Sequence, residues 1–515
     1  MSQALDSAGL PDWLPEFDAF AERTLKRAAV PGAAVAITLH GKVVYRRGFG
    51  WRDREARLPA GPATVFGLAS LSKSFTALTA LVLQAQGRLS LDDRVADLLP
   101  DFDYPGLGRA ADGRHDVRLW QMLSHTSGVP PLRALEFALD GNQVGDPAFV
   151  YATSEPVAVQ HVDDYDQLLA YLRQGEREAI GAPGRYVSYS NECVALVGAI
   201  IERVTGRAFP DVVRELVLEP LGMHTAGYDT AVARATGDVT TLYTHDPTGA
   251  VIRSPVWNEG PAYLGTGFLK ASVDDLAAYL AFLAAGEGAV LGVPNDLLAE
   301  LTSPRAWAAP GADYALGWTV RRQGGVTVVR HGGSLKGIAT AQGFLPELGL
   351  GVAVLTNVDD APAGRVWQAA INLALGQPAG RATYAGRGYR IARGAAPDDP
   401  GLTCVAGLYS SGEPWGRLEL RVERALAGAA SGVGGQAGAG GASGTWELRA
   451  YNGEDAAPAG RLAWLADQAP GKHEYVLVTE ENGEEGAWDG GRFQFDAEGR
   501  TVAMQHSLRW YDRLG

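Results

Sequence analysis

The sequence is poor in cysteine and in lysine. Its 515 residues include two cysteines, Cys193 and Cys404, and six lysines, although arginine is abundant. Two cysteines so far apart predict no disulfide framework, and neither has the neighbours of a metal-binding motif. The chain also lacks a phosphate-binding loop. We therefore expect buried free thiols, no metal site and no cofactor.

The marks of export and of membrane or nucleic-acid binding are missing too. Residues 1–20 have neither the basic start nor the apolar run of a signal peptide. The sequence contains no run of about 18 apolar residues, the length needed to span a bilayer. The net charge of −14 disfavours nucleic acid and anionic membranes as partners. These features predict a cytoplasmic protein.

One stretch stands out: Ser70-Leu71-Ser72-Lys73, ahead of the apolar helical run 75–85. Lys73 lies three residues after Ser70, so both side chains fall on one face of a helix, one turn apart. A serine hydroxyl needs a basic neighbour to become a nucleophile, and the N–H groups of a helix start favour negative charge. The alternative is a helix cap with a solvated lysine. Lys73 is, however, the one lysine of the six with a serine three residues before it.

The region 1–380 mixes strand and helix patterns. It predicts an α+β fold, an antiparallel sheet flanked by helices with a helical subdomain. Residues 131–178 have no clear period, and we interpret them as a long surface excursion, either a wall of a substrate pocket or a solvated loop. Strands are expected at 33–39, 43–49, 316–321, 326–330, 338–345 and 351–357, and helices at 13–29, 75–85, 92–99, 119–128, 194–204, 209–218, 269–283 and 365–375.

The end of the chain has a different composition. Residues 381–400 are rich in Gly, Pro and Arg and predict a linker. Short strand-like segments then indicate a small all-β barrel or sandwich domain over 401–515. Residues 427–444 are Gly/Ala/Ser low complexity and predict a flexible loop between two barrel strands. The expected strands are 418–422, 446–450, 461–465, 474–478, 492–496 and 501–508.

A second motif is Tyr189-Ser190-Asn191, the one Tyr-x-Asn of the chain. A nearby cation such as Lys73 favours the phenolate form of a tyrosine. Tyr189 could then take the Ser70 proton and later return it to a leaving group, with Asn191 orienting Lys73. An edge tyrosine beside a turn asparagine is the alternative.

The third motif is His331-Gly332-Gly333-Ser334, after the expected strand 326–330. Glycines after a strand let a ligand lie against the backbone. A backbone N–H there could pair with that of Ser70 as an oxyanion hole, and His331 could supply a polar contact next to Tyr189. A hairpin turn with a surface histidine is the alternative.

Together, in this order, the three motifs resemble the serine β-lactamase and penicillin-binding-protein superfamily. The branch that they resemble most holds class C β-lactamases, D-Ala-D-Ala carboxypeptidases, D-aminopeptidases and family VIII esterases. Further resemblance lies in residues 123–128, 220–223 and 316–318, and it covers about residues 15–377. The C-terminal strands are similar to the lipocalin-like domain attached to some of these peptidases, which implies a role in shaping the site or in assembly.

The resemblance implies roles for individual residues. Ser70 is expected to be the acylated nucleophile, and Lys73 to lower the pKa of Ser70 and Tyr189. Tyr189 is expected to be the general base and acid, and Asn191 to orient Lys73 and substrate. The N–H groups of Ser70 and Ser334, next to Gly333, are expected to form the oxyanion hole.

His331 stands where many members of the superfamily have the lysine of Lys-Thr-Gly. Its charge is weaker and depends on pH, and the neighbouring hydroxyl is missing. This difference disfavours β-lactam and D-Ala-D-Ala substrates, whose carboxylate usually meets that lysine.

The sequence thus predicts a serine hydrolase that acts through an acyl-enzyme on an ester or amide carbonyl, as an esterase or a D-amino-acid peptidase. A β-lactamase or D-Ala-D-Ala carboxypeptidase is the alternative within enzymes, and a non-catalytic penicillin-binding-like protein is the alternative outside them. The expected partner is a small-molecule or peptide substrate. Whether the protein forms a homo-oligomer stays open.

Overall fold

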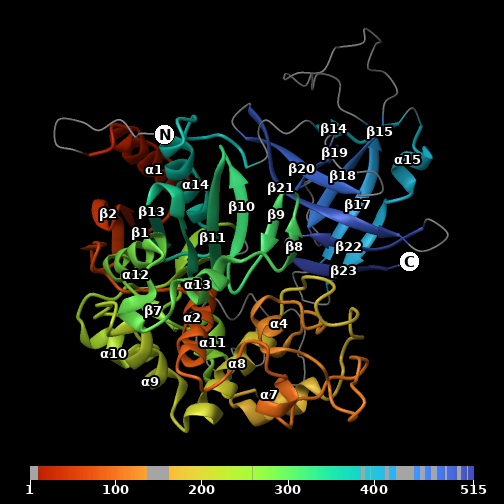
Figure 1. Cartoon of the computed structure of the whole chain (residues 1–515). Coiled ribbons are helices and arrows are strands. Elements are labelled where there is room, and N and C mark those ends of the chain that lie inside the picture. The colour runs from red at the N-terminus through yellow and green to blue at the C-terminus, as the bar shows by residue number, and fades with distance from the viewer. Residues whose placement is uncertain are drawn as a thin grey trace.

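A computed structural model shows two large β-sheets, one in each of two regions of the chain (Figure 1). The first region holds most of the helices as well. The structure describes residues 10–135, 146, 162–246, 248–257, 259–383, 389–394, 396–411, 417–424, 446–452, 459–465, 473–481, 484–495, 500–506 and 508–514.

The first sheet has nine strands in the order β3-β2-β1-β13-β12-β11-β10-β9-β8, and every neighbouring pair is antiparallel. The expected hairpin β1–β2 and the later strands all belong to it. The bounds are β1 Gly32–Leu39, β2 Lys42–Asp53, β3 Leu58–Pro59, β8 Ala306–Ala309, β9 Ala312–Tyr314, β10 Thr319–Gln323, β11 Val326–Leu335, β12 Ile338–Leu345 and β13 Leu350–Thr356.

The interior strand β1 is buried on both faces, which explains its almost uninterrupted apolar sequence. Val35 and Ile37 pack into the layer formed with α1 (Leu14–Arg27) and α14 (Ala363–Ala374). Ala34 and Ala36 face the opposite layer, which contains the larger core. Successive side chains of a strand point to opposite faces, so the alternation places helices on both sides of the sheet.

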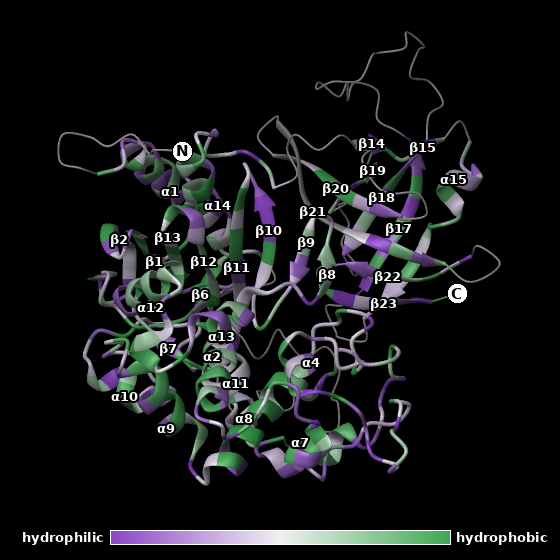
Figure 2. Cartoon of the chain, in the orientation of Figure 1, coloured by the Kyte–Doolittle hydropathy of each residue, from purple (hydrophilic) through white to green (hydrophobic). Residues whose placement is uncertain are grey.

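The larger core lies among helices that connect β4 to β8. Their apolar faces pack together with one face of the sheet, and Figure 2 shows hydrophobic segments in them. The bounds are α2 Ser72–Ala85, α3 Val95–Leu98, α4 Leu119–Leu123, α7 Tyr165–Leu172, α8 Asn191–Thr205, α9 Phe209–Val213, α10 Thr230–Ala235, α11 Leu264–Gly267, α12 Val273–Ala285 and α13 Asn295–Ala299, with the short strands β4 Phe66–Gly67, β5 Tyr243–His245, β6 Val251–Arg253 and β7 Lys270–Ala271.

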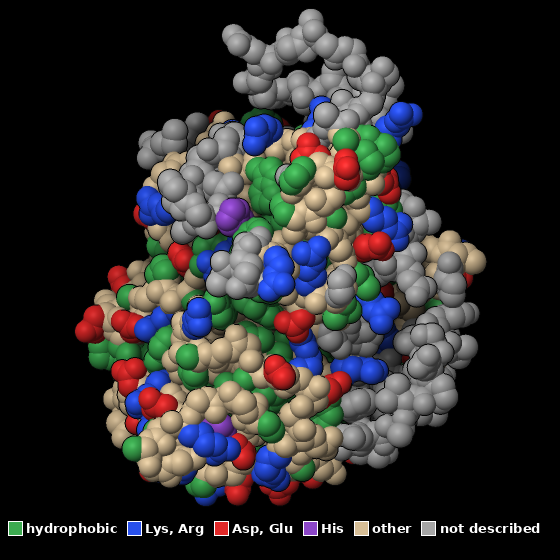
Figure 3. Space-filling model, turned by 90° about the vertical axis from the view of Figure 1, so that its right-hand side faces the viewer, with side chains coloured by type: hydrophobic (Ala, Val, Ile, Leu, Met, Phe, Trp, Pro, Cys, Tyr) green, Lys and Arg blue, Asp and Glu red, His purple; other side chains and the backbone are tan. Residues whose placement is uncertain are grey.

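The second sheet closes into an antiparallel barrel of eight strands, β16 to β23, because β18 pairs with both β17 and β19. Acidic and basic side chains are interspersed on the barrel-side face of the molecule (Figure 3). The bounds are β14 Tyr389–Ile391, β15 Arg393–Gly394, α15 Pro400–Thr403, β16 Gly407–Ser410, β17 Arg417–Arg424, β18 Trp446–Asn452, β19 Gly460–Leu465, β20 Glu474–Glu481, β21 Glu484–Phe495, β22 Thr501–His506 and β23 Arg509–Leu514.

The barrel contacts the edge of the first sheet through polar and aromatic side chains. The Trp307 indole on β8 donates to Glu474 on β20 at 3.1 Å. The Arg492 guanidinium on β21 lies 4.1 Å from the centre of the same indole ring. Arg177 forms an ion pair of 2.6 Å with Asp512 on β23. These contacts fix the barrel beside the helices that precede α8.

The α+β fold with a C-terminal barrel confirms the expected fold class, but several elements differ from the sequence-based prediction. The helix expected at 269–283 begins at Val273, because Ser272 caps it by accepting from the Asp275 N–H. The helix expected at 119–128 ends at Leu123.

Part of the expected surface excursion 131–178 is a helix. Its residues Tyr165–Leu172 form α7, whose Leu168 and Leu172 are fully buried, with Asp164 as the cap that accepts from Gln167 N–H. Asp146 is buried as well and accepts from Ser254 Oγ at 2.7 Å. The described parts of this segment are therefore packed against the core, whereas residues 136–145 and 147–161 lie outside the described residues.

At the barrel, the sequence prediction missed strands. The strand expected at 501–508 ends at His506, and a turn leads into the unexpected strand β23. Strands β14 and β15 lie within the segment expected to be a linker. The expected flexible loop 427–444 lies outside the described residues. Within the described part of the chain, no helix is both long and apolar enough to cross a membrane, and a cytoplasmic location stays a prediction.

Candidate active site

Ser70 lies in a tight turn immediately before α2. The turn spans Ala69–Leu71 as a single 3₁₀ turn, and Ala69 has a φ of 48°, a left-handed conformation that an alanine rarely adopts. The Ser72 hydroxyl holds the turn, because it donates to Ala69 O at 2.7 Å and accepts from Leu269 N–H at 3.1 Å. Strained backbone of this kind costs about 1–3 kcal/mol and is common at functional sites.

Lys73 is almost fully buried, with 1% of its surface exposed, and its Nζ lies 3.0 Å from Ser70 Oγ. The same nitrogen donates to Thr266 O at 2.9 Å. Burial, reinforced by the positive charge of Arg509 and opposed by Glu192, holds the pKa of Lys73 well below its usual value. A neutral amine in this position can accept the proton of the Ser70 hydroxyl.

Tyr189 lies directly beside this pair. It is 6% exposed, and Lys73 Nζ lies 4.7 Å from the centre of its ring. The His125 ring packs against the Tyr189 ring with centroids 4.0 Å apart. The motifs predicted from the sequence thus meet in space.

His125, which the sequence analysis left out of the site, is therefore part of its wall. Its Nδ1 accepts from Ser190 N–H at 3.1 Å, so the neutral ring carries its proton on Nε2. Burial, with Lys73, His331 and Arg509 adding to the effect, holds the pKa of His125 well below its usual value. The buried Nε2 has no hydrogen-bond partner among the described residues.

His331 lies within β11 and not after a strand end as expected. It is 5% exposed, and burial together with Lys73 lowers its pKa to about 3, so the imidazole is neutral at ordinary pH. Its Nδ1 lies 2.6 Å from Gly332 O, and Tyr314 Oη lies 2.8 Å from its Nε2. Burial keeps the pKa of Tyr314 well above its usual value, so the phenol donates to His331 Nε2.

Gly333 lets β11 lie against the turn that carries Ser70. A Cβ at this position would come within 2.6 Å of Leu68 O, closer than real side chains come, and would lie 3.1 Å from Ala69 Cβ, a tight contact. Thr340 on β12 completes this packing by donating to Leu68 O at 2.9 Å. Ser334, the next residue of β11, is exposed.

Asn191 begins α8, and its carbonyl accepts from the Thr266 hydroxyl at 2.9 Å. Among the described residues, the acceptors within reach of Lys73 are Ser70 Oγ and Thr266 O. Thr266, which no sequence motif marks, therefore orients Lys73, and the structure records no hydrogen bond from Lys73 to the Asn191 side chain.

The sequence analysis also missed the turn between β22 and β23. Leu508 O accepts from Tyr189 N–H at 2.8 Å, and the Arg509 guanidinium lies 5.1 Å from the centre of the Tyr189 ring. Leu508 has a φ of 66° and His125 a φ of 57°. With Ala69, three of the seven described non-glycine residues of positive φ thus surround the site.

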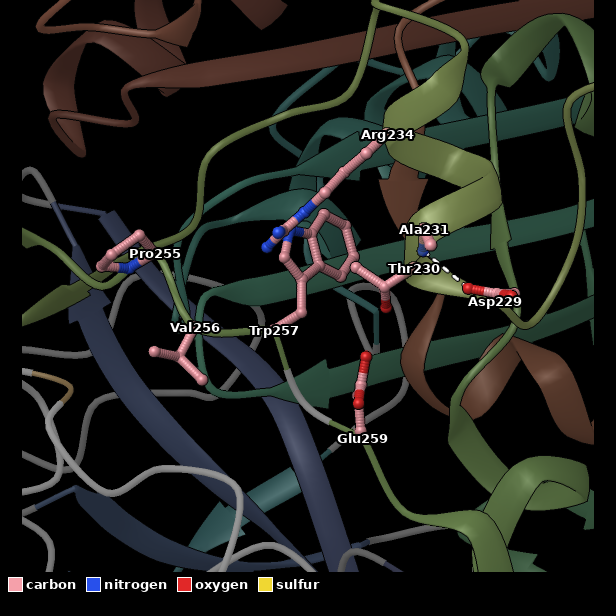
Figure 4. Close-up of a pocket in the computed structure, with 8 residues that line it drawn as sticks. All are labelled: Asp229, Thr230, Ala231, Arg234, Pro255, Val256, Trp257 and Glu259. Carbon is pink, nitrogen blue, oxygen red and sulfur yellow. Dashed lines mark hydrogen bonds between the residues drawn. The ribbon is translucent and has the colours of Figure 1, made fainter.

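Two further features, a side-chain cluster and a surface pocket, have the composition or shape of a ligand site. His245, Asp359 and Asp360 bring their ligand atoms within 4.8 Å of one another, and this partly exposed cluster is the one metal-ligand group in the described residues. A surface pocket of about 420 Å³ lies between α10 and the segment 255–259, with Arg234, Glu259 and Trp257 on its wall (Figure 4). Trp257 also belongs to a small buried cluster with Ala69, Leu242 and Ile338.

The fold and the site together define an α+β protein with a Ser–Lys–Tyr centre of the kind found in serine hydrolases. The family model described as Beta-lactamase matches residues 17–376. The chain therefore belongs to the β-lactamase family.

Three known proteins illustrate the range of its relatives. The chain is 34% identical to esterase EstB of Burkholderia gladioli over 229 residues, which are 44% of this chain and 54% of that protein. It is 25% identical to a D-stereospecific amidohydrolase from Streptomyces sp., with a TM-score of 0.53 over 68% of this chain and 97% of that one.

The third is an octameric penicillin-binding protein homologue from Pyrococcus abyssi, with a TM-score of 0.62, 24% identity and coverage of 97% of this chain and 99% of that one. This likeness extends over both sheets and shows the fold. The chain spans 63% of the length of the first curated relatives that it matches.

Proposed function

We propose that the protein is a serine hydrolase that forms an acyl-enzyme on Ser70. The observation that carries the proposal is the buried Lys73 amine, which lies 3.0 Å from Ser70 Oγ and 4.7 Å from the centre of the Tyr189 ring. A solvated lysine after a helix cap would lie in water with an ordinary pKa. The burial of Lys73 and its lowered pKa instead suit a proton acceptor.

In the proposed reaction, Ser70 Oγ attacks the substrate carbonyl carbon while its proton passes to Lys73 Nζ. Tyr189 relays that proton to the leaving alcohol or amine as the carbon–heteroatom bond breaks. Water then attacks the acyl group on Ser70 and gives its proton to the same pair, which returns it to Ser70 Oγ as the bond to the acyl carbon breaks and the acid leaves.

We assign the oxyanion hole to the backbone N–H groups of Ser70 and Ser334. The close packing of β11 on the Ser70 turn, which requires Gly333, supports this assignment. One such donor contributes about 3–4 kcal/mol to transition-state stabilisation. Asn191, at the start of α8, is proposed as a contact for substrate.

Amides and peptides of D-amino acids, and simple esters, are the proposed substrates. The D-stereospecific amidohydrolase and esterase EstB among the relatives support these classes. The neutral His331 supports them too, because it offers no fixed charge to a β-lactam carboxylate. A β-lactamase or D-Ala-D-Ala carboxypeptidase activity is the second candidate, favoured by the family match.

Steady-state hydrolysis of three substrates by the wild type and by Ser70→Ala tests the proposal. They are a short-chain p-nitrophenyl ester, a D-alanine p-nitroanilide and a chromogenic cephalosporin. We expect turnover of the ester or the anilide, lost in Ser70→Ala. Dominant cephalosporin turnover would favour the second candidate. If none of the three substrates is hydrolysed and Ser70 is not acylated, the result would favour a non-catalytic binding protein.

We also propose that the chain forms a homo-oligomer, supported by the octameric assembly of the Pyrococcus abyssi neighbour. Light scattering of the purified protein tests this, since a solution mass equal to the 54.3 kDa of one chain would reject it.

A further inference from the structure

The turn between β22 and β23 is docked onto the segment that carries Tyr189. Leu508 O accepts from Tyr189 N–H at 2.8 Å. Two residues before Tyr189, Val187 O accepts from the buried Gln505 side chain at 2.6 Å. Leu508 also packs against an apolar cluster of Val187, Tyr189 and Tyr314. The barrel therefore holds the Tyr189 backbone directly.

This docking brings the Arg509 guanidinium to the same ring that Lys73 contacts. Arg509 Cζ lies 5.1 Å and Lys73 Nζ 4.7 Å from the centre of the Tyr189 ring. Two basic side chains, the buried Lys73 amine and the Arg509 guanidinium, thus lie against one phenol ring.

The other titratable groups around Lys73 come from three elements. Buried Glu192 on α8 is the acidic one, and it acts on Lys73 in the opposite sense to Arg509. The His125 ring packs against the Tyr189 ring, and His331 comes from β11. Burial keeps both imidazoles neutral. Arg509 is therefore the fixed positive charge that the barrel adds to this environment.

We propose that Arg509 is a positioning residue for proton transfer: its guanidinium, held against the Tyr189 ring by the barrel turn, keeps the neighbouring Lys73 amine able to accept the Ser70 proton. The barrel is then an electrostatic part of the active site as well as a neighbour of it. The proposal rests on the proposed function only for its consequence on rate, because the protonation state of Lys73 can be measured without turnover.

The size of the effect follows from Coulomb's law. At an effective dielectric constant of about 40, between those of a protein surface and of water, a unit charge roughly 7–10 Å away shifts the protonation of an amine by about half to one pH unit. Removing the positive charge of Arg509 raises the pKa of the Lys73 amine, because that charge disfavours the protonated form.

The first test is an NMR titration of the protein labelled with ¹³C at lysine Cε. The chain has six lysines, so the resonances are few, and Lys73→Met assigns the one of interest. We expect Arg509→Met to move the Lys73 titration upward by about half to one pH unit, and Arg509→Lys to leave it nearly in place. The matched control is Arg421→Met, because Arg421 lies 4.3 Å from the ring of Tyr451 on the barrel, away from the site.

An unchanged Lys73 titration in Arg509→Met, or an equal shift in Arg421→Met, would overturn the proposal even if no substrate is turned over. The second test is the pH dependence of kcat/KM on whichever substrate is hydrolysed. The acid limb is expected to move to higher pH in Arg509→Met alone. An equal loss of rate at all pH values in both Arg509→Met and Arg509→Lys would instead show that the turn has a purely structural role.

Discussion

The two segments that meet at Tyr189 are built in different ways. Ser70 and Lys73 are three residues apart, and the geometry of one helical turn brings Oγ and Nζ to 3.0 Å. Leu508 and Arg509 reach the same tyrosine from the far end of the chain, through the pairing of the whole barrel. Catalytic groups that are neighbours in the sequence can be recognised from a motif. A group that a distant turn brings to the site can be identified only in the folded structure.

Breaking the local segment should have the largest effect. Lys73→Met removes the proton acceptor, and we expect activity to fall by about 10³-fold or more while the fold is retained. Lys270→Met is the matched control, because Lys270 is also buried, with a pKa lowered to about 8, but donates to Tyr228 O and Phe268 O and not to a serine. Equal losses in both variants, measured as kcat/KM, would contradict a special role for Lys73.

Removal of the Tyr189 hydroxyl, where the two segments meet, should have the second largest effect. Tyr189→Phe keeps the ring between His125, Lys73 and Arg509 but deletes the proton relay, so kcat is expected to fall by about 10²-fold. The thermal midpoint should stay close to that of the wild type. A variant with wild-type kcat would assign the whole proton transfer to Lys73.

The burial of Lys73 also predicts a pH-dependent difference in stability. Its pKa is depressed in the folded state, so the folded protein binds fewer protons than the unfolded chain, and stability rises with pH. The rise begins at the folded-state pKa and ends near the ordinary value of 10.5. The advantage in unfolding free energy of Lys73→Met over wild type should therefore be largest at low pH and shrink as the pH approaches 10.5. Parallel stability curves from urea titrations at several pH values would contradict a lysine that is buried neutral.

Loosening the distant segment should have the smallest effect. Gln505→Ala removes the hydrogen bond to Val187 O, which contributes about 1 kcal/mol, and leaves the Leu508 contact in place. We expect a loss of activity of a few-fold, visible as a lower kcat with KM almost unchanged. No change in activity or stability would show that Leu508 alone fixes the turn.

The difference between the local segment and the distant turn also determines how much of the site could be predicted from the sequence. The Ser70–Lys73 spacing, the β1–β2 hairpin and the α+β class follow from local periodicity, and Tyr189 and His331 were found through motifs. The neutral state of His331 could not be foreseen, because it depends on burial beneath Tyr314 and on the nearby Lys73.

Other parts of the site carry no sequence signal. Thr266 contributes a carbonyl, which any residue could supply, and Arg509 is one arginine among many in the chain. The turn before Arg509 was predicted as the end of a strand, and its sequence carries no glycine, proline or asparagine to mark it. Long-range pairing, not local preference, decides where such a turn lies.

The central claim is that Ser70 forms a covalent acyl-type bond, and intact-mass analysis with a fluorophosphonate probe tests it most directly. Wild type and Ser303→Ala, which changes a serine outside the site, should each gain one adduct, mapped by peptide sequencing to Ser70. Ser70→Ala should gain none. An adduct on another residue, or no adduct on a wild-type protein that turns over substrate, would contradict the account.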